Sequence, residues 1–542
     1  MVLPRGRGLP HRPRGLGGDR RRHRDLPRSG PDRHRQRAKG RVPRRRSRRA
    51  MRPKRRPNRA RPLACLLLST AGSCTISDGS SGPSGVSVER IGGGGTGENV
   101  LIVIADDLGV DQVEAYGLYP GQPPTPTIST LAADGVRFER AYAFPTCSPS
   151  RAALMTGRLP NRVGIGGWIE PPDDYFDLPL AEVTIPEMLD QGQLHTYTSA
   201  LFGKWHLATH RYPDYGHHAL DQGFDWWQGS PENLGGALHQ DPNGGKNNYY
   251  HWEKSTNGVL AHTEHYATTD TVDDALAKIP TMPEPWFVVV SFNAPHIPLH
   301  LPPAHLHTQN IPLDDCALDS QACWRAMVEA LDTELGRLLQ GLDPALLDRT
   351  TTIFTADNGT SGDWIVPPFR SSRGKGTLFD GGVRVPLIVT GPHVSDPGSV
   401  SDAFANLVDL FPTVAELAGV DLTTVRPVPG APVIHIDGRS LVDVIEDPSL
   451  ETTPYQFSQK FAPNGPTDQL LQERTMARSS THKLIRITGD RPELYRYVDG
   501  AIDEGDDLLG PAGPPTPEDL SAYRQLDRLL DTIVASASYE GP

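Results

Sequence analysis

Four segments of the chain are continuous, mostly apolar runs, without alternation between apolar and polar positions. They cover residues 99–104 (NVLIVI), 287–292 (FVVVSF), 351–355 (TTIFT) and 385–389 (VPLIV). Continuous apolar runs of this length are typical of strands that are buried on both faces of a parallel sheet. Amphipathic stretches such as residues 324–342 lie between them. The pattern therefore predicts an α/β fold with a large, mostly parallel sheet flanked by helices.

Polar residues stand directly after three of these predicted strands. Asp106 and Asp107 follow the first, His296 follows the second within the segment NAPH, and Asp357 and Asn358 follow the third. In open α/β sheets, ligands bind at the edge formed by the carboxyl ends of the strands. We therefore expect these side chains to converge on one site, although about 250 residues of sequence separate the first from the last.

The pattern changes beyond about residue 450. Residues 483–487 and 493–497 are predicted short strands, and residues 517–537 form a predicted terminal helix. The sequence thus predicts a main domain at 98–450 and a smaller C-terminal α+β domain at 451–542.

The charges are strongly segregated along the chain. Residues 1–62 hold 25 basic and 3 acidic residues, a net charge of +22, whereas the remaining residues carry −33 and the whole chain −11. An arginine-rich arm can bind nucleic acid, but this one has no aromatic residues for stacking and no apolar period. We interpret residues 1–50 as a disordered basic tail or a mis-called gene start, and we expect no nucleic-acid partner.

A second methionine, Met51, opens a segment with the features of a secretory signal. Residues 51–73 begin with a basic stretch, continue with the apolar run 63–68 and end in small residues before Cys74. The apolar run is much shorter than the roughly 20 residues of a membrane span. Small residues before a cysteine resemble a bacterial lipoprotein processing site. We predict an exported protein, periplasmic or at the cell surface, with Cys74 as a candidate lipid anchor and 74–97 as a Gly/Ser-rich linker.

Two cysteines far from the signal, Cys316 and Cys323, are separated by seven positions. In an exported protein they form either a small-loop disulfide or two free buried thiols, and spacing alone does not decide between these alternatives.

The most informative stretch is residues 147–158, CSPSRAALMTGR. A proline there favours a helix start that places Cys147 where backbone amides can stabilise an anion, with Arg151 nearby. The stretch matches Cys-x-Pro-Ser-Arg-x-x-Leu-x-Thr-Gly-Arg at every defined position and so resembles the type I sulfatases, over about residues 99–509. The resemblance implies an alkaline-phosphatase-like fold and hydrolysis of sulfate monoesters. It also implies that a formylglycine-generating enzyme oxidises Cys147 to formylglycine, whose hydrate is the nucleophile.

The resemblance also implies a metal site at the strand ends. Asp106, Asp107, Asp357 and Asn358 would ligate Ca²⁺, with the oxidised residue 147 completing the shell. Carboxylate and amide oxygens suit a hard cation, Ca²⁺ or Mg²⁺, whereas zinc would call for a cluster of His and Cys.

Further motifs match the family along the chain. Residues 203–206 (GKWH) contain Lys204 and His206, and residues 373–377 (RGKGT) contain Lys375. Lys204 and Lys375 would attract the anionic sulfate. The remaining roles implied by the resemblance are activation of the attacking hydroxyl by Asp357, protonation of the leaving oxygen by His296 with Lys375, assistance to sulfate release by His206, and orientation of the nucleophile by Arg151.

The substrate is less defined than the reaction. We expect a small sulfate ester or a sulfated sugar, and the sequence indicates no oligomeric state. Aromatic residues in or beside the insert 229–258 either form a rim that stacks on a substrate ring or fill the core; they are Trp226, Trp227, Tyr249, Tyr250 and Trp252. Two alternatives stay open: a phosphonate or phosphate ester hydrolase of the same superfamily, and a non-catalytic surface-binding protein on this scaffold.

Overall fold

The computed structural model describes residues 97–169, 176–235, 247–466, 470–497, 504–511 and 513–536. By backbone contacts the chain divides into residues 1–89 and residues 90–542, and all described elements belong to the second unit. The predicted basic tail, the signal peptide, the lipid anchor at Cys74 and nearly all of the linker lie outside the described residues.

Ten strands of the described chain form one mixed sheet, in the order β10-β2-β9-β8-β1-β7-β3-β4-β5-β6. The central strands β8, β1, β7 and β3 run parallel to one another, as do β3 with β4 and β2 with β10. β9 is antiparallel to β8 and β2. The strands are β1 (Asn99–Ala105), β2 (Val136–Tyr142), β3 (Thr198–Gly203), β4 (Trp226–Gly229), β5 (Trp252–Thr256), β6 (Val259–Thr263), β7 (Trp286–Ser291), β8 (Thr350–Ala356), β9 (Leu387–Thr390) and β10 (Ser399–Asn406).

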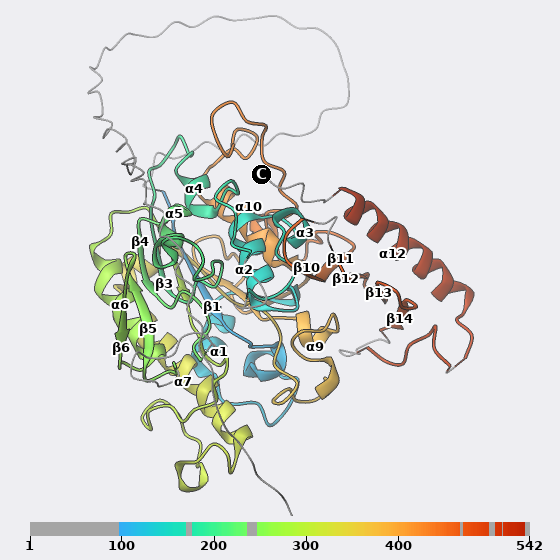
Figure 1. Cartoon of the computed structure of the whole chain (residues 1–542), viewed down its shortest axis with the longest axis horizontal. Coiled ribbons are helices and arrows are strands. Elements are labelled where there is room, and N and C mark those ends of the chain that lie inside the picture. Colours follow the sequence, from blue (N-terminus) through green and yellow to red (C-terminus); the bar gives the residue numbers. More distant parts are fainter. Residues whose placement is uncertain are drawn as a thin grey trace, which may run out of the picture. The chain divides into compact units, whose positions relative to one another are not determined.

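All residues of β1, β7 and β8 are buried, because helices cover both faces of the central sheet. One group of helices, α1, α6 and α7, packs together, and a second group is formed by α2, α4 and α10; Figure 1 shows β1 between these groups. The predicted α/β fold is thus confirmed. The helices are α1 (Pro126–Asp134), α2 (Cys147–Thr156), α3 (Pro160–Val163), α4 (Ile185–Leu189), α5 (His218–Asp221), α6 (Ala267–Lys278), α7 (Ser320–Gly341), α8 (Pro344–Leu347), α9 (Asp380–Val383), α10 (Leu410–Leu417), α11 (Val442–Glu446) and α12 (Pro517–Ser536).

A second, antiparallel sheet follows near the C-terminus. It consists of β11 (Gln456–Ala462), β12 (Gln472–Arg478), β13 (His482–Ile487) and β14 (Glu493–Arg496), paired in chain order. One face packs on α12 through Leu484, Leu526 and Leu530. The other face packs on the segment that contains α9, through Met476 and Val383.

Buried ion pairs join this second sheet to the segment around α9. The fully buried ammonium of Lys483 lies 2.7 Å from Asp380 Oδ1 and 2.5 Å from Glu504 Oε1. Arg478 Nη1 lies 3.0 Å from the other oxygen of Asp380. These ion pairs therefore attach the segment that contains Lys375 and Asp380 to the second sheet.

A disulfide joins Cys323, in the first turn of α7, to Cys316 in the segment before the helix, so the structure selects the first of the two alternatives for these residues. Among the described helices, none combines the length and the apolar composition needed to cross a membrane.

Candidate active site

Three neighbouring strands bring the predicted acidic side chains together. β1 pairs with both β7 and β8, and the chain continues this pairing past the strand ends, since Asp106 N donates to Ala294 O and Asp357 N donates to Ala105 O. Asp107 then takes a left-handed backbone conformation, with φ 71°. Non-glycine residues rarely adopt this conformation, and those that do often lie at functional sites. Here it lets Asp107 N donate to Asp357 Oδ1 at 3.2 Å.

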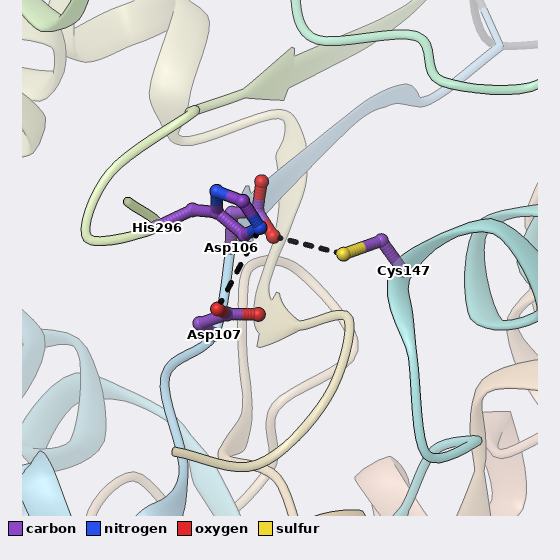
Figure 2. Close-up of side chains that lie close together, drawn as sticks. All are labelled: Asp106, Asp107, Cys147 and His296. Carbon is purple, nitrogen blue, oxygen red and sulfur yellow. Dashed lines mark hydrogen bonds and ion pairs between the residues drawn. The ribbon is translucent and has the colours of Figure 1, made fainter. Parts of the chain in front are cut away.

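Cys147 is the first residue of α2 and is buried. Its Sγ lies 3.3 Å from Asp106 Oδ1, as Figure 2 shows, and 3.4 Å from Lys375 Nζ. Burial and the carboxylates of Asp106 and Asp357 raise the pKa of the Cys147 thiol far above its ordinary value. The unmodified thiol is therefore held protonated, which disfavours a thiolate nucleophile.

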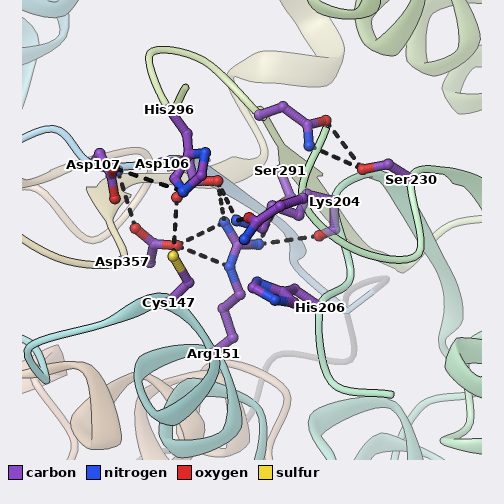
Figure 3. Close-up of polar contacts among 12 residues, drawn as sticks. Asp106, Asp107, Cys147, Arg151, Lys204, His206, Ser230, Ser291, His296 and Asp357 are labelled. Carbon is purple, nitrogen blue, oxygen red and sulfur yellow. Dashed lines mark hydrogen bonds and ion pairs between the residues drawn. The ribbon is translucent and has the colours of Figure 1, made fainter. Parts of the chain in front are cut away.

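Arg151 projects into the site from the fifth position of the same helix, about one turn after Cys147 (Figure 3). Its Nε donates to Asp357 Oδ2 at 2.9 Å, and its Nη1 donates to Ser291 Oγ at 2.6 Å and to Lys204 O at 3.1 Å. These contacts fix the guanidinium plane. The motif thus positions both a sulfur atom and a buried cation from one helix end.

Lys204 enters the site because β3 ends in a sharp turn at Gly203, with φ 92°. A Cβ at this glycine would come within 2.0 Å of Ser291 O, so another residue would displace the backbone. Lys204 Nζ contacts Asp106 Oδ2 and donates to Asn233 Oδ1 at 2.5 Å. Burial alone would raise the pKa of Asp106, but Lys204, with smaller contributions from nearby cations, lowers it well below the ordinary value.

Lys375 faces the opposite carboxylate, with Nζ 2.5 Å from Asp107 Oδ1. Burial lowers its pKa, but Asp107, Cys147 and Asp106 outweigh this and raise the pKa above the ordinary value. Lys375 is therefore an ammonium at neutral pH.

Both predicted histidines are buried and electrically neutral at neutral pH. Burial and Lys375 lower the pKa of His296 to about 4, and its Nε2 lies 3.9 Å from Asp107 Oδ2. Burial and Lys204 lower the pKa of His206 well below its ordinary value. His206 Nε2 lies 3.0 Å from Ile169 O, whereas its Nδ1 is buried with no hydrogen-bond partner.

A group of buried side chains at this edge of the sheet could hold a metal ion, and it differs in part from the predicted ligands because it contains His296 and lacks Asp357. Ligand atoms of four buried residues lie within 4.8 Å of one another: Asp106, Asp107, Cys147 and His296. Asn358 Nδ2 donates to Asp107 Oδ1 at 2.7 Å, which leaves the buried Oδ1 of Asn358 without a partner. An unpartnered amide oxygen beside carboxylates is a set of oxygen ligands that Ca²⁺ or Mg²⁺ can bind.

A cavity of about 350 Å³ opens above this cluster. Cys147, Lys375, His296 and Asp107 lie in its wall together with Trp168, Asn233, Leu234, Gly235, Ile297, Pro298, Ser361, Asp363 and Trp364. The aromatic residues that the sequence offered as a rim are not among them. Trp227, Tyr249 and Trp252 are instead buried in the core, and Tyr249 supports the site indirectly because its hydroxyl donates to His296 O at 2.7 Å.

Sequence reasoning missed two polar residues, Ser291 and Asn233, that bind Arg151 and Lys204. Ser291 is the polar position in the otherwise apolar run FVVVSF, a signal that the sequence does contain. Asn233 lies in a loop without a comparable pattern, so only the folded chain reveals its contact.

Comparison with known proteins agrees with this arrangement. The family model named Sulfatase matches residues 98–420. Human arylsulfatase A is 28% identical over 497 residues, 82% of this chain and 89% of that protein. Human N-acetylgalactosamine-6-sulfatase is 31% identical over 355 residues, 61% of this chain and 64% of that protein.

Solved structures share the fold at lower identity. Ps i-CgsB in complex with k-i-k-neocarrahexaose has a TM-score of 0.62 and 23% identity, over 80% of this chain and 92% of that one. BT4656 in complex with its substrate D-glucosamine-2-N,6-O-disulfate has a TM-score of 0.58 and 22% identity, over 80% of this chain and 97% of that one. Because the family model spans more than half of the chain, this protein belongs to the sulfatase family and is a sulfatase.

Proposed function

We propose that this protein hydrolyses sulfate monoesters with a formylglycine formed from Cys147 by a formylglycine-generating enzyme. The observation that carries the proposal is the position of Cys147: a buried residue at a helix start, in a cavity wall, within 3.4 Å of Asp106 Oδ1 and Lys375 Nζ. A hydrated aldehyde can expel sulfate and return to the carbonyl, whereas a serine or cysteine would be left as a stable sulfate ester or thiosulfate.

Asp106, Asp107, Asp357 and Asn358, with residue 147, would hold a Ca²⁺ ion, and Mg²⁺ fits the same oxygen donors. When bound, the cation supplies positive charge beside the sulfate oxygens. Arg151 and Lys204 add two fixed cations from the protein. Asp357 accepts a proton from the nucleophilic hydroxyl at residue 147, and its contact with Arg151 orients the carboxylate for this task.

The two residues on the leaving-group side differ in charge. Lys375 is an ammonium and His296 is a neutral imidazole at pH 7. We assign the proton donated to the leaving oxygen to Lys375, with His296 placed beside it as a hydrogen-bonding partner. His206, whose Nδ1 is buried and unpartnered, would accept the proton that is lost when sulfate leaves.

The substrate proposed is a small aryl sulfate or a sulfated sugar, encountered outside the cytoplasm. Two similar structures contain k-i-k-neocarrahexaose and D-glucosamine-2-N,6-O-disulfate, which supports a sulfated sugar as the substrate. The export signal at 51–73 and the lipid anchor at Cys74 remain part of the proposal.

Mass spectrometry of the tryptic peptide that contains residue 147, from protein made in the native host, tests the nucleophile. We expect the mass of formylglycine, and a homogeneous unmodified cysteine would overturn the mechanism. Turnover of 4-nitrophenyl sulfate is then compared with a phosphate diester and a phosphonate monoester, with Cys147→Ala as the inactive control. A large preference for the phosphorus esters would contradict the proposal that the substrate is a sulfate ester.

A further inference from the structure

The second sheet carries two cations that have no acidic partner among the described residues. Its strands β11–β14 contain six Lys and Arg residues, and four of them form ion pairs with carboxylates: Arg478, Lys483, Arg486 and Arg496. The other two, Lys460 and Arg474, form no ion pair with any residue that the structure describes. They therefore differ from every other basic side chain of the sheet.

These two cations also face each other. Lys460 on β11 is directly opposite Arg474 on β12, and directly opposite residues project from the same face of an antiparallel pair. Like charges in this arrangement destabilise a sheet. Burial, Arg474 and Lys375 together lower the pKa of Lys460, which is half-buried. The repulsion is relieved if an anion binds between them.

Lys460, one member of this pair, lies beside the cavity that contains Cys147. Lys460 Nζ donates to Gly376 O at 3.2 Å, and Gly376 directly follows Lys375 in the chain. The same ammonium lies 5.2 Å from the centre of the Trp168 ring. Trp168 belongs to the cavity wall and keeps 44% of its surface exposed. An extended ligand that leaves the cavity along Trp168 would reach Lys460.

We propose that Lys460 and Arg474 form an anion subsite for a second anionic group, a sulfate or a carboxylate, of a sulfated saccharide whose scissile sulfate lies at residue 147. Trp168 supports a sugar ring between the two anions, because aromatic faces pack against the apolar faces of such rings. The carboxylate of Asp363, which also lies in the cavity wall, repels anions. It therefore favours placement of the second anionic group near Lys460 over placement near Asp363. This inference rests on the proposed function for the position of the first sulfate.

The test is a binding measurement in a Cys147→Ala background, which prevents turnover. Calorimetry compares glucosamine and galactosamine monosulfates with their disulfates, and with sulfated disaccharides that contain a uronic acid. We expect the best ligand with two anionic groups to bind about tenfold tighter than its monosulfated counterpart, as a charge-assisted hydrogen bond predicts. Lys460→Met and Arg474→Met should each reduce this ratio toward one, and Lys460→Arg should retain most of it.

Arg528→Met is the matched control, since Arg528 is an exposed cation on α12; it should leave the ratio unchanged. The inference is overturned if no dianionic ligand binds preferentially, or if the control lowers the ratio as much as Lys460→Met does. Wild-type turnover of 4-nitrophenyl sulfate is measured separately. Its absence, combined with a retained dianion preference, would reject the proposed reaction and not the subsite.

Discussion

Arg151 meets Asp357 side-on, so that Nε and Nη2 of the guanidinium lie 2.9 and 2.8 Å from the same carboxylate oxygen. Its remaining nitrogen, Nη1, donates to Ser291 and to the backbone of Lys204. One planar side chain thus connects the ends of β3, β7 and β8. A single point charge cannot make these contacts simultaneously.

We therefore predict that Arg151→Lys lowers kcat/KM for 4-nitrophenyl sulfate by at least about a hundredfold, the scale of losing a preorganised charge contact. Circular dichroism should show an intact fold. The variant Ser291→Ala, which removes only one partner, should lose less activity. Equal kcat/KM values for Arg151→Lys and wild type would contradict this account of Arg151.

Removal of divalent cations should affect stability as well as activity. Asp106, Asp107 and Asp357 crowd three carboxylates into one buried cluster. We expect dialysis against EDTA to lower both kcat and Tm, and Ca²⁺ or Mg²⁺ to restore them to different extents. Asn358→Ala should weaken the affinity for the restoring ion. Full activity in protein shown to be metal-free by elemental analysis would exclude the proposed site.

A pH-dependent contribution to stability is expected far from the active site. His393 bridges Glu98 and Glu446, each at 2.9 Å, and the hydrogen bond to Glu98 is the main cause that raises the pKa of His393 to about 9. Because this pKa lies above the ordinary value of about 6.5, the stabilisation is complete below pH 6.5 and is lost as pH rises through 9.

The Tm of the wild type should therefore fall more steeply than that of His393→Gln between pH 7 and pH 9.5, as differential scanning fluorimetry would record. Parallel Tm profiles for the two proteins would show that the His393 bridge makes no pH-dependent contribution.

The buried ammonium of Lys483 should contribute strongly to folding. Lys483→Met removes the buried cation that Asp380 and Glu504 share and leaves Asp380 with only Arg478, and breaking a buried ion pair costs about 3–5 kcal/mol. Arg486→Met is the control, because its ion pairs are partly exposed and are worth about 1 kcal/mol or less. Urea unfolding measures both. Similar losses of unfolding free energy in the two variants would show that the burial of an ion pair does not determine its contribution to stability.

The central architecture was predictable because its signal is local. The runs that became β1, β7 and β8 are almost continuously apolar, and the polar residues after them, Asp106, Asp357 and His296, lie close together at one edge of the sheet. The short strands β4–β6 carry no such signal, since they pair at the sheet edge and none of them is buried along its whole length.

The partners of the site residues were less predictable because they depend on tertiary contacts. Asn233 reaches Lys204 from a loop, and Trp168 reaches the cavity from a segment without periodicity. Likewise, nothing in the sequence distinguishes Lys460 from the other cations of its sheet before the pairing with Arg474 is known. The domain division at residue 450 stays a prediction.

The ion pairs between the second sheet and Asp380 have a consequence for the redesign of this enzyme. Asp380 lies five residues after Lys375, and its cations Arg478 and Lys483 belong to β12 and β13. A chimera that takes only the C-terminal sheet from a relative would separate the two halves of this network. The unit that can be exchanged between relatives is therefore discontinuous in sequence. The second sheet must be transferred together with the segment from Arg373 to Arg384.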